Sequence, residues 1–280
     1  MSFMCSVVIP TYNAATTLDE QLAALSVQNG DIDFEVIVAD NGSTDDLHHV
    51  VERWSSSLSV RTVDASARRG PSAARNIGAM ASTAPLLLFC DADDIARPSW
   101  VASLAAALVD RPFVGGPYHP FATRDGIWLP TFETATLPTA WDDLTYAFGG
   151  NFAVRAETWE SVGGFDESLT GAEEIEFAWR ARSLGLVPAF VPGAVMDYRI
   201  RSSIRGRLWH EYNSGRGTTL LAMRVRPDLV PSRSWKGRAR HVAMLAARFP
   251  RSLSGPRWAA WAAALAFDAG VRHALRQRRS

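Results

Sequence analysis

The amino-acid sequence predicts an α/β fold, in which helices flank a mostly parallel sheet and a basic helical C-terminal extension follows. Short apolar runs alternate with helix-like segments from the first residues onward, as in a parallel sheet covered by helices. Several runs end in Asp, Asn or Gly, as strands do where a sheet edge faces a ligand. The charge distribution sets the extension apart: residues 1–198 hold 26 acidic and 11 basic side chains, and residues 199–280 hold 3 acidic and 18 basic ones.

The predicted strands and helices follow in a regular order. Strands are expected over residues 6–10, 34–39, 58–63 and 86–90, with helices over 16–28, 44–56 and 71–81 between them. Residues 43–46, Ser-Thr-Asp-Asp, resemble a capping box and support a helix start there. After a helix over 98–109 the pattern loosens, and a strand over 151–155, a helix over 173–184 and a strand over 187–191 complete the domain.

Cysteine content and hydropathy argue against secreted and membrane-spanning proteins. Cys5 and Cys90 are the only cysteines and lie in apolar runs, so no disulfide framework is expected and a reducing, cytoplasmic compartment is the default. The N-terminus lacks the pattern of a signal peptide. The longest apolar candidate, residues 258–267, is shorter than the about 20 residues of a spanning helix, so we expect no membrane crossing.

Three carboxylates follow the fourth predicted strand: Asp91, Asp93 and Asp94. Ligands of open α/β sheets bind beyond the carboxyl ends of the strands, so these acids are expected to face a ligand. Closely spaced carboxylates attract a cation, and their oxygens suit Mg2+ or Mn2+, which in turn suit phosphate substrates. The residues alone are equally compatible with a strand-end turn that caps the next helix.

Two more turns are expected at the same edge of the sheet. The residues that close the first strand are Pro10, Thr11, Tyr12 and Asn13. Asp40 closes the second strand, where it can accept a hydrogen bond from a nucleobase N–H or a ribose hydroxyl, although turn chemistry explains this segment as well. Arg75, in the third helix, offers a planar fork to a phosphate, a carboxylate or a base edge, and an exposed helical Arg is the ordinary alternative.

The order of the segments is diagnostic. The first four read Val-Val-Ile-Pro-Thr-Tyr-Asn (7–13), Val-Ile-Val-Ala-Asp-Asn-Gly-Ser-Thr-Asp (36–45), Gly-Pro-Ser-Ala-Ala-Arg-Asn-Ile-Gly (70–78) and Phe-Cys-Asp-Ala-Asp-Asp (89–94), and further ones cover 150–155, 163–167 and 171–180. Over roughly residues 5–220 the chain resembles the family 2 glycosyltransferases, which have the Rossmann-like GT-A fold. The resemblance implies a domain over 1–222, with a nucleotide-sugar half (about 1–110) and an acceptor half (about 111–222), and an extension over 223–280.

The resemblance also implies roles for the residues at the sheet edge. Asp40 would contact the nucleobase, and residues 10–13 would line the same pocket. Asp91 and Asp93 would form the Asp-x-Asp motif, with Asp93 as the direct ligand of Mg2+ or Mn2+ and Asp91 near the ribose or a metal-bound water. Arg75 would lie against the base and the acidic cluster.

The catalytic base departs from the family pattern. Relatives use the second acid of a Glu-Asp pair, and here the pair reads Glu173-Glu174. Glu174 matches the position of the base, but its side chain is one methylene longer, so Glu173 stays an alternative. Both acids would also stabilise the N-terminus of the predicted helix without any catalytic role.

A second departure concerns the diphosphate side. Many relatives place a His near residues 197–199, where this chain has Asp197, so either Asp197 supplies an oxygen ligand or the metal keeps an extra water. Arg199 and Arg201 would pair with the diphosphate. The segment 214–217 also fits a family pattern for a loop near the site, with Arg216 as a phosphate contact.

The acceptor is expected between the strand that begins at Asn151, the helix that carries Trp179 and Arg180, and the stretch 111–149. Aromatic residues of that stretch would stack on a sugar ring or an apolar aglycone, although most aromatic residues pack in cores. These residues are Trp128, Phe132, Trp141 and Tyr146.

The extension contains two basic amphipathic pieces. The apolar faces are formed by Val242, Leu245 and Phe249 in the first piece and by Trp258, Trp261 and Leu265 in the second. Basic helices with Trp are typical of elements that lie on anionic membrane surfaces, which would place a cytoplasmic enzyme peripherally on the inner face of the cell membrane. Alternatively, these faces dock on the acidic domain or form a homodimer.

The resemblance implies an inverting, metal-dependent transfer of a sugar from a nucleotide-diphosphate sugar to an acceptor hydroxyl. The acceptor would be a glycan, a lipid-linked or a small molecule, in the synthesis of cell-envelope polysaccharide, glycolipid or another glycoconjugate. The alternatives are a non-catalytic homologue that binds nucleotide sugars and a nucleotidyltransferase, although the Gly-rich basic loop usual in the latter is missing after the first strand. No nucleic-acid-reading motif is recognised.

Overall fold

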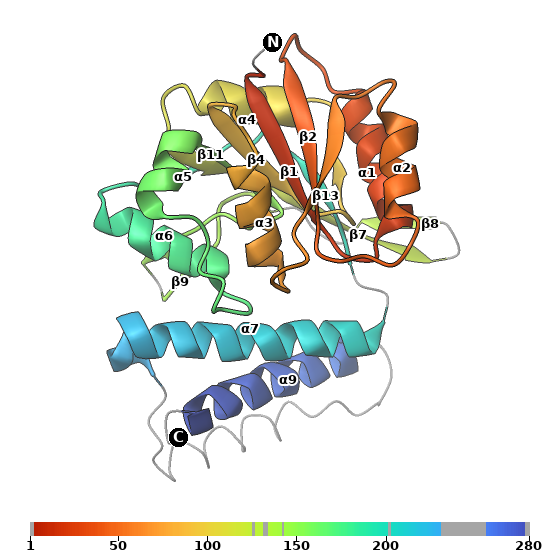
Figure 1. The fold of residues 1–280 in the computed structure, drawn as a ribbon. Coiled ribbons are helices and arrows are strands. Elements are labelled where there is room, and N and C mark those ends of the chain that lie inside the picture. Colours follow the sequence, from red (N-terminus) through yellow and green to blue (C-terminus); the bar gives the residue numbers. More distant parts are fainter. Residues whose placement is uncertain are drawn as a thin grey trace. The chain divides into compact units, whose positions relative to one another are not determined.

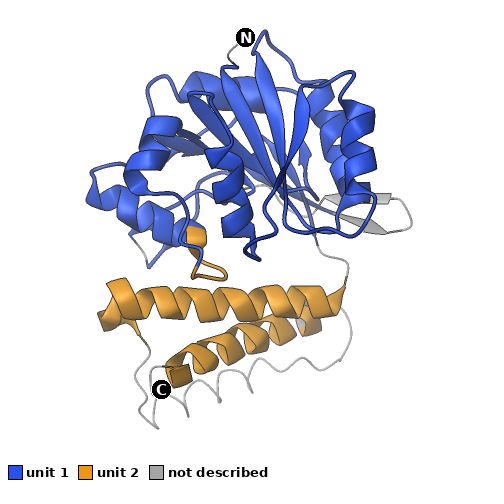
Figure 2. Ribbon diagram, in the orientation of Figure 1, with its two compact units in different colours: residues 1–167, 174–200 blue, residues 168–173, 201–280 orange. Residues whose placement is uncertain are grey.

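The computed structural model describes residues 3–124, 127–130, 134–141, 143–200, 203–230 and 256–277. It divides into two compact units, residues 1–167 with 174–200 and residues 168–173 with 201–280 (Figure 2). The division at residue 200 differs from the predicted one at 222, because the helix that contains residue 222 (204–225) packs along the helix of the extension.

The first unit is built on a seven-stranded sheet with the order β12-β6-β11-β4-β1-β2-β3 (Figure 1). The strands are β1 (Cys5–Thr11), β2 (Phe34–Asp40), β3 (Val60–Asp64), β4 (Leu86–Cys90), β6 (Phe113–Gly115), β11 (Asn151–Arg155) and β12 (Ala189–Phe190). β1 lies parallel to β2 and β4, and β2 to β3, whereas β11 runs antiparallel to β4 and β6. The mostly parallel sheet is therefore confirmed.

Helices cover both faces of this sheet, as predicted. They are α1 (Ala15–Ser26), α2 (Leu47–Trp54), α3 (Pro71–Met80), α4 (Trp100–Ala107), α5 (Ala156–Val162) and α6 (Glu173–Ser183). Alternating side chains of the strands feed two cores, so Val7 and Leu88 pack with α1, α2 and α4, and Val8 and Phe89 pack with α3, α5 and α6. This alternation follows from the period of two along a strand.

A four-stranded sheet, β5-β13-β7-β8, adjoins the acidic cluster. Its strands are β5 (Ile95–Ala96), β7 (Tyr118–Arg124), β8 (Ile127–Pro130) and β13 (Met196–Arg199), and a small hairpin joins β9 (Thr139–Ala140) to β10 (Leu144–Thr145). β13 pairs with both β5 and β7. Through this pairing, residues near position 197 reach the end of β4.

The predicted capping box is wrong. α2 begins at Leu47, and its N-cap Asp46 makes no capping hydrogen bond through its side chain. The neighbouring side chains bind the turn after β1 instead, because Ser43 Oγ accepts from the Asn13 N–H (3.0 Å) and Asp45 Oδ2 accepts from the Ala15 N–H (2.8 Å). These side chains therefore join the turn after β2 to the turn after β1 and the first residue of α1, and they do not begin α2.

The second unit consists mainly of α7 (Ile204–Val225), the short helix η1 (Pro227–Leu229) and α9 (Pro256–Gln277). The segment 214–217 lies inside α7 and is not a loop, and Arg216 donates to Gln277 Oε1 (3.3 Å). Its glycines permit close packing: a Cβ at Gly215 would collide with the Phe267 carbonyl, and one at Gly217 with the Gly171 carbonyl.

The predicted second amphipathic piece corresponds to α9, in which Trp258, Trp261 and Leu265 are half-buried. The first piece, with Val242, Leu245 and Phe249, lies outside the described residues. Among the described helices, none has the length and apolar character needed to cross a membrane.

Candidate functional site

The loops that follow β1 and β2 meet at one edge of the sheet. The parallel register pairs Thr11 with Asp40, and the Asn41 N–H donates to the Thr11 carbonyl (2.8 Å). Asn13 takes up a left-handed backbone conformation (φ 49°), and its Oδ1 accepts from the Thr44 N–H (2.8 Å). The two turns expected at this edge are therefore one connected structure.

Asp40 is buried at this edge, with 8% of its surface exposed. Its Oδ1 accepts from the backbone N–H groups of Gly42 (3.1 Å) and Ser43 (2.8 Å), and its Oδ2 lies 3.6 Å from His48 Nε2. One carboxylate oxygen thus shapes the turn, and the other is not used by the backbone.

Sequence analysis missed two residues beside this turn, Asn41 and Arg69. Asn41 holds the loop 65–70, because its Nδ2 donates to the carbonyls of Ala65 (2.6 Å) and Arg68 (2.8 Å). The guanidinium of Arg69 lies 5.0 Å from the ring centre of Tyr12, whose side chain is exposed. The motif that contains Asn41 was visible in the sequence, whereas no sequence pattern pointed to Arg69.

Arg75 and Asp91 form a short ion pair at the end of β4. The Arg75 Nη2 donates to Asp91 Oδ1 (2.6 Å), and the Arg75 side chain is 5% exposed against 32% for Asp91. The contact between Arg75 and the acidic cluster is therefore present.

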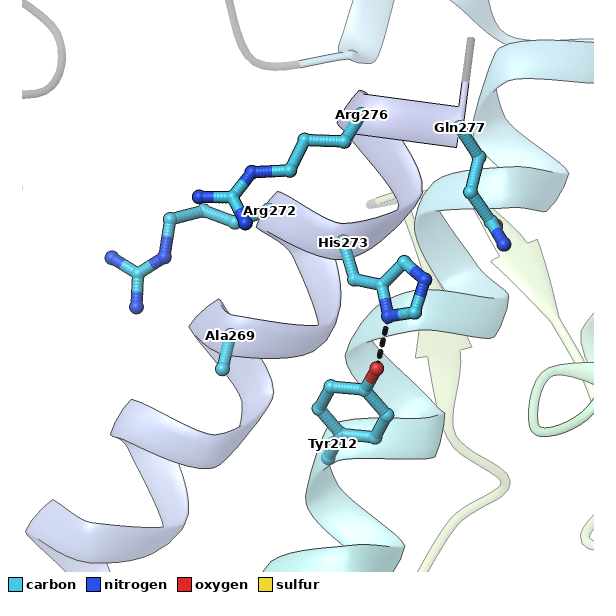
Figure 3. A pocket seen from close by; sticks show the side chains of 6 residues that line it. All are labelled: Tyr212, Ala269, Arg272, His273, Arg276 and Gln277. Atoms are coloured by element: carbon cyan, nitrogen blue, oxygen red, sulfur yellow. Dashed lines mark hydrogen bonds between the residues drawn. The ribbon is translucent and has the colours of Figure 1, made fainter. Parts of the chain in front are cut away.

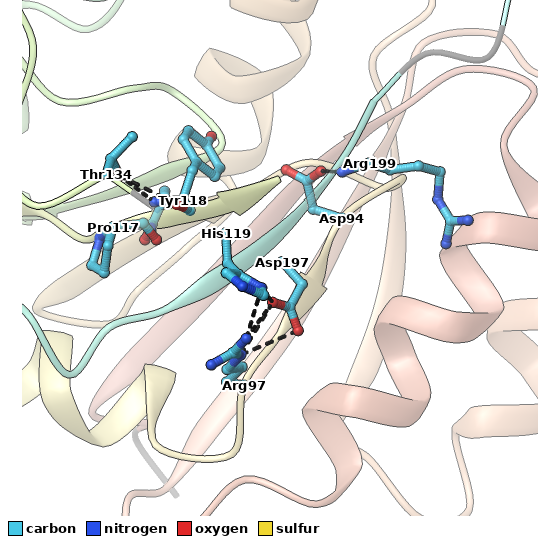
Figure 4. A network of polar contacts seen from close by, with 9 residues as sticks. Asp94, Arg97, Pro117, Tyr118, His119, Thr134, Asp197 and Arg199 are labelled. Carbon is cyan, nitrogen blue, oxygen red and sulfur yellow. Dashed lines mark hydrogen bonds and ion pairs between the residues drawn. The ribbon is translucent and has the colours of Figure 1, made fainter. Parts of the chain in front are cut away.

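Asp94 lies deeper than the other two acids. It is fully buried, its Oδ1 accepts from the Arg199 N–H (3.0 Å), and its Oδ2 has no hydrogen-bond partner among the described residues (Figure 4). Burial raises the pKa of this carboxyl well above its usual range, and the charges of Asp91 and Asp93 raise it further. A buried acid beside two others makes this edge strongly attractive to a cation.

Arg199 holds the acidic loop rather than facing away from it. Its Nε donates to the Asp93 carbonyl (2.9 Å), and its guanidinium also binds Glu20 and lies over the Phe121 ring (5.0 Å). The Arg199 guanidinium is therefore occupied by protein groups and is not held free for a diphosphate. Arg201 lies outside the described residues.

Glu174 reaches the same place from α6, because its Oε1 accepts from the Gly149 N–H (3.2 Å). Two adjacent glycines make room for this convergence. A Cβ at Gly149 would lie 3.1 Å from Glu174 Oε1 and 3.2 Å from Arg75 Cζ, and a Cβ at Gly150 would lie 2.7 Å from Asp91 Oδ2. Side chains from the loop after β4, from α3 and from α6 therefore surround the segment 149–150.

Two tyrosines that border this cluster respond to its charge. The Tyr118 hydroxyl would lie 2.6 Å from a Cβ at Gly150, and burial, followed by the charges of Asp94 and Asp91, raises the pKa of Tyr118 well above its usual range. Burial and the nearby Glu174 charge raise the pKa of Tyr146 to about 12. Tyr146 was an acceptor candidate from the sequence, whereas Tyr118 was missed.

Glu173 and Glu174 begin α6, as the sequence predicted. Glu173 is 7% exposed and belongs to the segment 168–173 of the second unit, whereas Glu174 belongs to the first. Of the two, Glu174 has a hydrogen bond to the loop beside Arg75 and Asp91.

Two of the expected acceptor residues have structural contacts instead. Asn151 is 1% exposed, and its amide donates to the carbonyls of Pro117 and Ala194 (3.0 Å each) and accepts from Trp100 Nε1 (2.8 Å). The amide is thereby occupied in joining three segments, so it does not face an acceptor.

Arg180 is similarly occupied. It forms two hydrogen bonds to Glu176 (2.6 Å each) and also donates to the carbonyls of Val162 and Gly164. Trp179 is half-buried, and Trp141 has a positive φ of 54°. Phe132 and the side chain of Trp128 lie outside the described part of the chain.

The proposal that Asp197 replaces the missing His as a ligand is wrong. Asp197 is 7% exposed, and Arg97 Nε donates to its two oxygens (3.1 and 3.2 Å) while His119 Nδ1 lies 3.0 Å from Oδ1 (Figure 4). The carboxylate therefore neutralises Arg97 and binds β13 to its neighbours. Within the described ranges, no three His, Cys, Asp or Glu side chains are arranged to hold a metal ion together.

Sequence relatives identify a family for most of the first unit. The model of Glycosyl transferase family 2 matches residues 6–177. A validoxylamine A glucosyltransferase from Streptomyces hygroscopicus subsp. jinggangensis is 34% identical over 222 residues, which cover 65% of this chain and 52% of that protein. A pre-mycofactocin glycosyltransferase from Mycobacterium tuberculosis is 27% identical over 241 residues, covering 80% and 48%. The chain thus spans about half the length of these curated relatives.

Solved structures agree on the fold. The mannosyltransferase PcManGT from Pyrobaculum calidifontis, in complex with GDP-Man and Mn2+, matches with a TM-score of 0.62 at 19% identity over 98% of this chain and 88% of that one. S. aureus TarS matches with a TM-score of 0.55 at 22% identity, over 80% and 40%. At such identities the likeness concerns the GT-A fold alone. Because the family model covers more than half of its residues, the chain belongs to glycosyl transferase family 2.

Proposed function

We propose that the chain transfers a sugar from a nucleotide-diphosphate sugar to an acceptor hydroxyl with inversion of configuration. The observation that carries this proposal is the convergence of Arg75, Asp91 and Glu174 around the segment 149–150, at the sheet edge that also holds Asp40. Family membership supports the reaction class.

The donor would bind along the edge formed by the ends of β1, β2 and β4. The Asp40 oxygen that the backbone does not use would accept from a base N–H, and the exposed Tyr12 ring would lie beside the base. The diphosphate would then reach the acidic cluster. The similar PcManGT structure holds GDP-Man and Mn2+, which supports a sugar nucleotide and a divalent cation as ligands here.

The residues present fit a divalent metal. Mg2+ is commonly held by one or two carboxylates together with substrate phosphates, so the lack of a three-residue cluster in the described chain does not conflict with such a site. Asp93 and Asp91 would hold the ion, and the unpartnered buried oxygen of Asp94 favours a cation nearby. When bound, the metal would neutralise charge on the leaving diphosphate. The extra metal-bound water stays the proposed replacement for the missing His.

Glu174 would take the proton from the attacking hydroxyl. Its Oε1 is oriented by the Gly149 N–H, which leaves Oε2 to accept from an acceptor hydroxyl. Arg75 neutralises Asp91 on the other side of the glycine pair, so Asp91 is a poor nucleophile. A single base and direct attack of the hydroxyl on the sugar would invert the configuration. The half-buried Trp179 and Tyr146 would border the acceptor.

The test uses the full chain, Mn2+ and a panel of sugar nucleotides, with release of nucleoside diphosphate as the measurement. In Glu174→Gln the side chain keeps an oxygen that accepts the hydrogen bond from the Gly149 N–H. We therefore expect nucleotide binding to persist while kcat falls about 100-fold or more. Glu173→Gln is the matched control and should keep most of the activity. Asp93→Asn should lose the metal-dependent rise of melting temperature with nucleotide.

Three outcomes would decide against parts of this proposal. Loss of activity in Glu173→Gln but not in Glu174→Gln would assign the base to Glu173. Binding of nucleotide sugars without turnover in the unaltered chain would favour the non-catalytic homologue. Unchanged activity in both Asp93→Asn and Glu174→Gln would reject the site.

A further inference from the structure

A basic cavity lies on the second unit and shares no residue with the proposed catalytic site. It has a volume of about 550 Å3 and is formed by α7 and α9 (Figure 3). Its lining residues are Tyr212, Ala269, Arg272, His273, Arg276 and Gln277. Among the described residues, no carboxylate lines it.

The register of α9 gathers its cations on one side. Arg272 and Arg276 are four residues apart, so they share a helix face, and Figure 3 shows both side chains extending to the same side of α9. Arg272 pairs with Asp268 one turn earlier (2.5 Å) but remains 51% exposed. Arg276 forms no ion pair with any described carboxylate.

The neutral groups of the cavity also present donors. His273 Nδ1 and the Tyr212 hydroxyl are hydrogen-bonded, and when the hydroxyl donates, the imidazole proton lies on Nε2. Gln277 Oε1 accepts from Arg216. The guanidinium groups of Arg272 and Arg276 can only donate, and a planar guanidinium suits a phosphate in particular.

An exposed aromatic residue adjoins the cavity. Trp209 is 63% exposed, and its ring stacks on Tyr212 with centres 5.4 Å apart and planes 18° apart. Trp and Tyr favour the boundary between headgroups and acyl chains, and basic side chains favour anionic headgroups. The excess of 18 basic over 3 acidic residues after position 198 adds long-range attraction to such a surface.

We propose that this cavity binds the phosphate of an anionic phospholipid headgroup, with Trp209 at the level of the interface. This inference goes beyond the proposed function, because binding is measured without sugar transfer. A failure of vesicle binding would therefore not contradict the proposed sugar transfer, and a failure of sugar transfer would not contradict vesicle binding.

The test is sedimentation of the full chain with vesicles of phosphatidylcholine alone or with about one third phosphatidylglycerol. Each basic side chain near an anionic surface contributes about 1 kcal/mol, a factor of about five, so Arg276→Ala should weaken binding to the anionic vesicles about fivefold and Arg272→Ala/Arg276→Ala about 25-fold. Arg53→Ala is the matched control, because it removes an ion-paired Arg of similar exposure (52%) from α2 of the first unit. We expect it to change binding by less than about twofold. Trp209→Ala should weaken binding as well.

Inorganic phosphate separates a headgroup site from a free-phosphate site. Phosphate should compete with anionic vesicles more strongly than chloride at equal ionic strength. Equal losses in Arg276→Ala and Arg53→Ala, or equal binding to both kinds of vesicle, would overturn the proposal. So would an Arg276-dependent rise of melting temperature in phosphate without binding to vesicles. Circular dichroism of each variant checks that the helices are intact.

Discussion

Gly150→Ala is a direct perturbation of the cluster around residues 149–150. Gly150 does not have a positive φ, so alanine is allowed by the backbone, and the effect comes from the added Cβ. That atom would lie 2.6 Å from the Tyr118 hydroxyl and 2.7 Å from Asp91 Oδ2, against an ordinary contact of 3.4 Å. Both groups must therefore move by about 0.7–0.8 Å, in a structure where the other Asp91 oxygen is held by Arg75.

Displacements of about 1 Å commonly lower catalysis about 100-fold, so we expect kcat to fall on the order of 100-fold. Overpacking should cost about 1–2 kcal/mol of stability after the smaller entropy of the unfolded alanine chain is included. Sugar-nucleotide turnover and urea unfolding measure the two effects. The substitution removes no charge and no side-chain hydrogen bond, so a loss of activity would follow from the displacement of Tyr118 and Asp91.

Gly149→Ala is the graded comparison. Its Cβ would lie 3.1 Å from Glu174 Oε1, so the neighbours must move by only about 0.3 Å, and activity should fall less than in Gly150→Ala. Gly150→Ala/Tyr118→Phe removes the closest contact and should regain part of the stability. Activity of Gly150→Ala within twofold of the unaltered protein would refute the reasoning.

Asn151→Ala leaves the Trp100 indole N–H and two backbone carbonyls without their partner, and urea unfolding should show a loss of about 3 kcal/mol. The KM for the acceptor should stay unchanged, whereas a raised KM at unchanged stability would restore its acceptor role. Arg180→Met deprives the buried Glu176 of its partner and should cost about 1–3 kcal/mol, with unfolding of unchanged m-value as the check. Burial raises the pKa of the Cys5 thiol from 9.0 to about 12, so unfolding releases a proton between these values. Stability contributed by the protonated thiol is complete below about pH 9 and is lost as the pH rises toward about 12. In alkaline urea titrations, the free energy of unfolding of Cys5→Ala should therefore decline less steeply than that of the unaltered protein, by up to about 1.4 kcal/mol per pH unit.

Several features could be predicted from the sequence because their signals are local. The strand at 86–90 and the acids after it are contiguous, and the alternation of strands with helices fixes a mostly parallel sheet. The turn at Asp40 could be placed at the same edge as these acids because parallel strands end on the same side. The family followed from the order of these segments, and the comparison with known proteins confirms it.

Other features depend on partners far apart in the chain. Ser43 and Asp45 resemble helix caps, yet they accept from the Asn13 N–H in the turn after β1 and from the Ala15 N–H at the start of α1, which the fold brings within reach. Asp197 was a candidate ligand until the pairing of β13 with β5 placed it against Arg97. Neither contact leaves a periodic pattern that sequence reasoning can detect.

The sequence by itself therefore determined the alternation of strands and helices as far as β4, the sheet edge that carries the acids, and the family, since each rests on neighbouring residues or on the period of a strand or helix. Only the tertiary structure decided that Glu174 meets the loop beside Asp91, that Asn151 and Arg180 are occupied by structural hydrogen bonds, and that the glycines of α7 serve helix packing. The physical reason is that packing and hydrogen bonding are satisfied in space, by whichever groups the fold brings within reach.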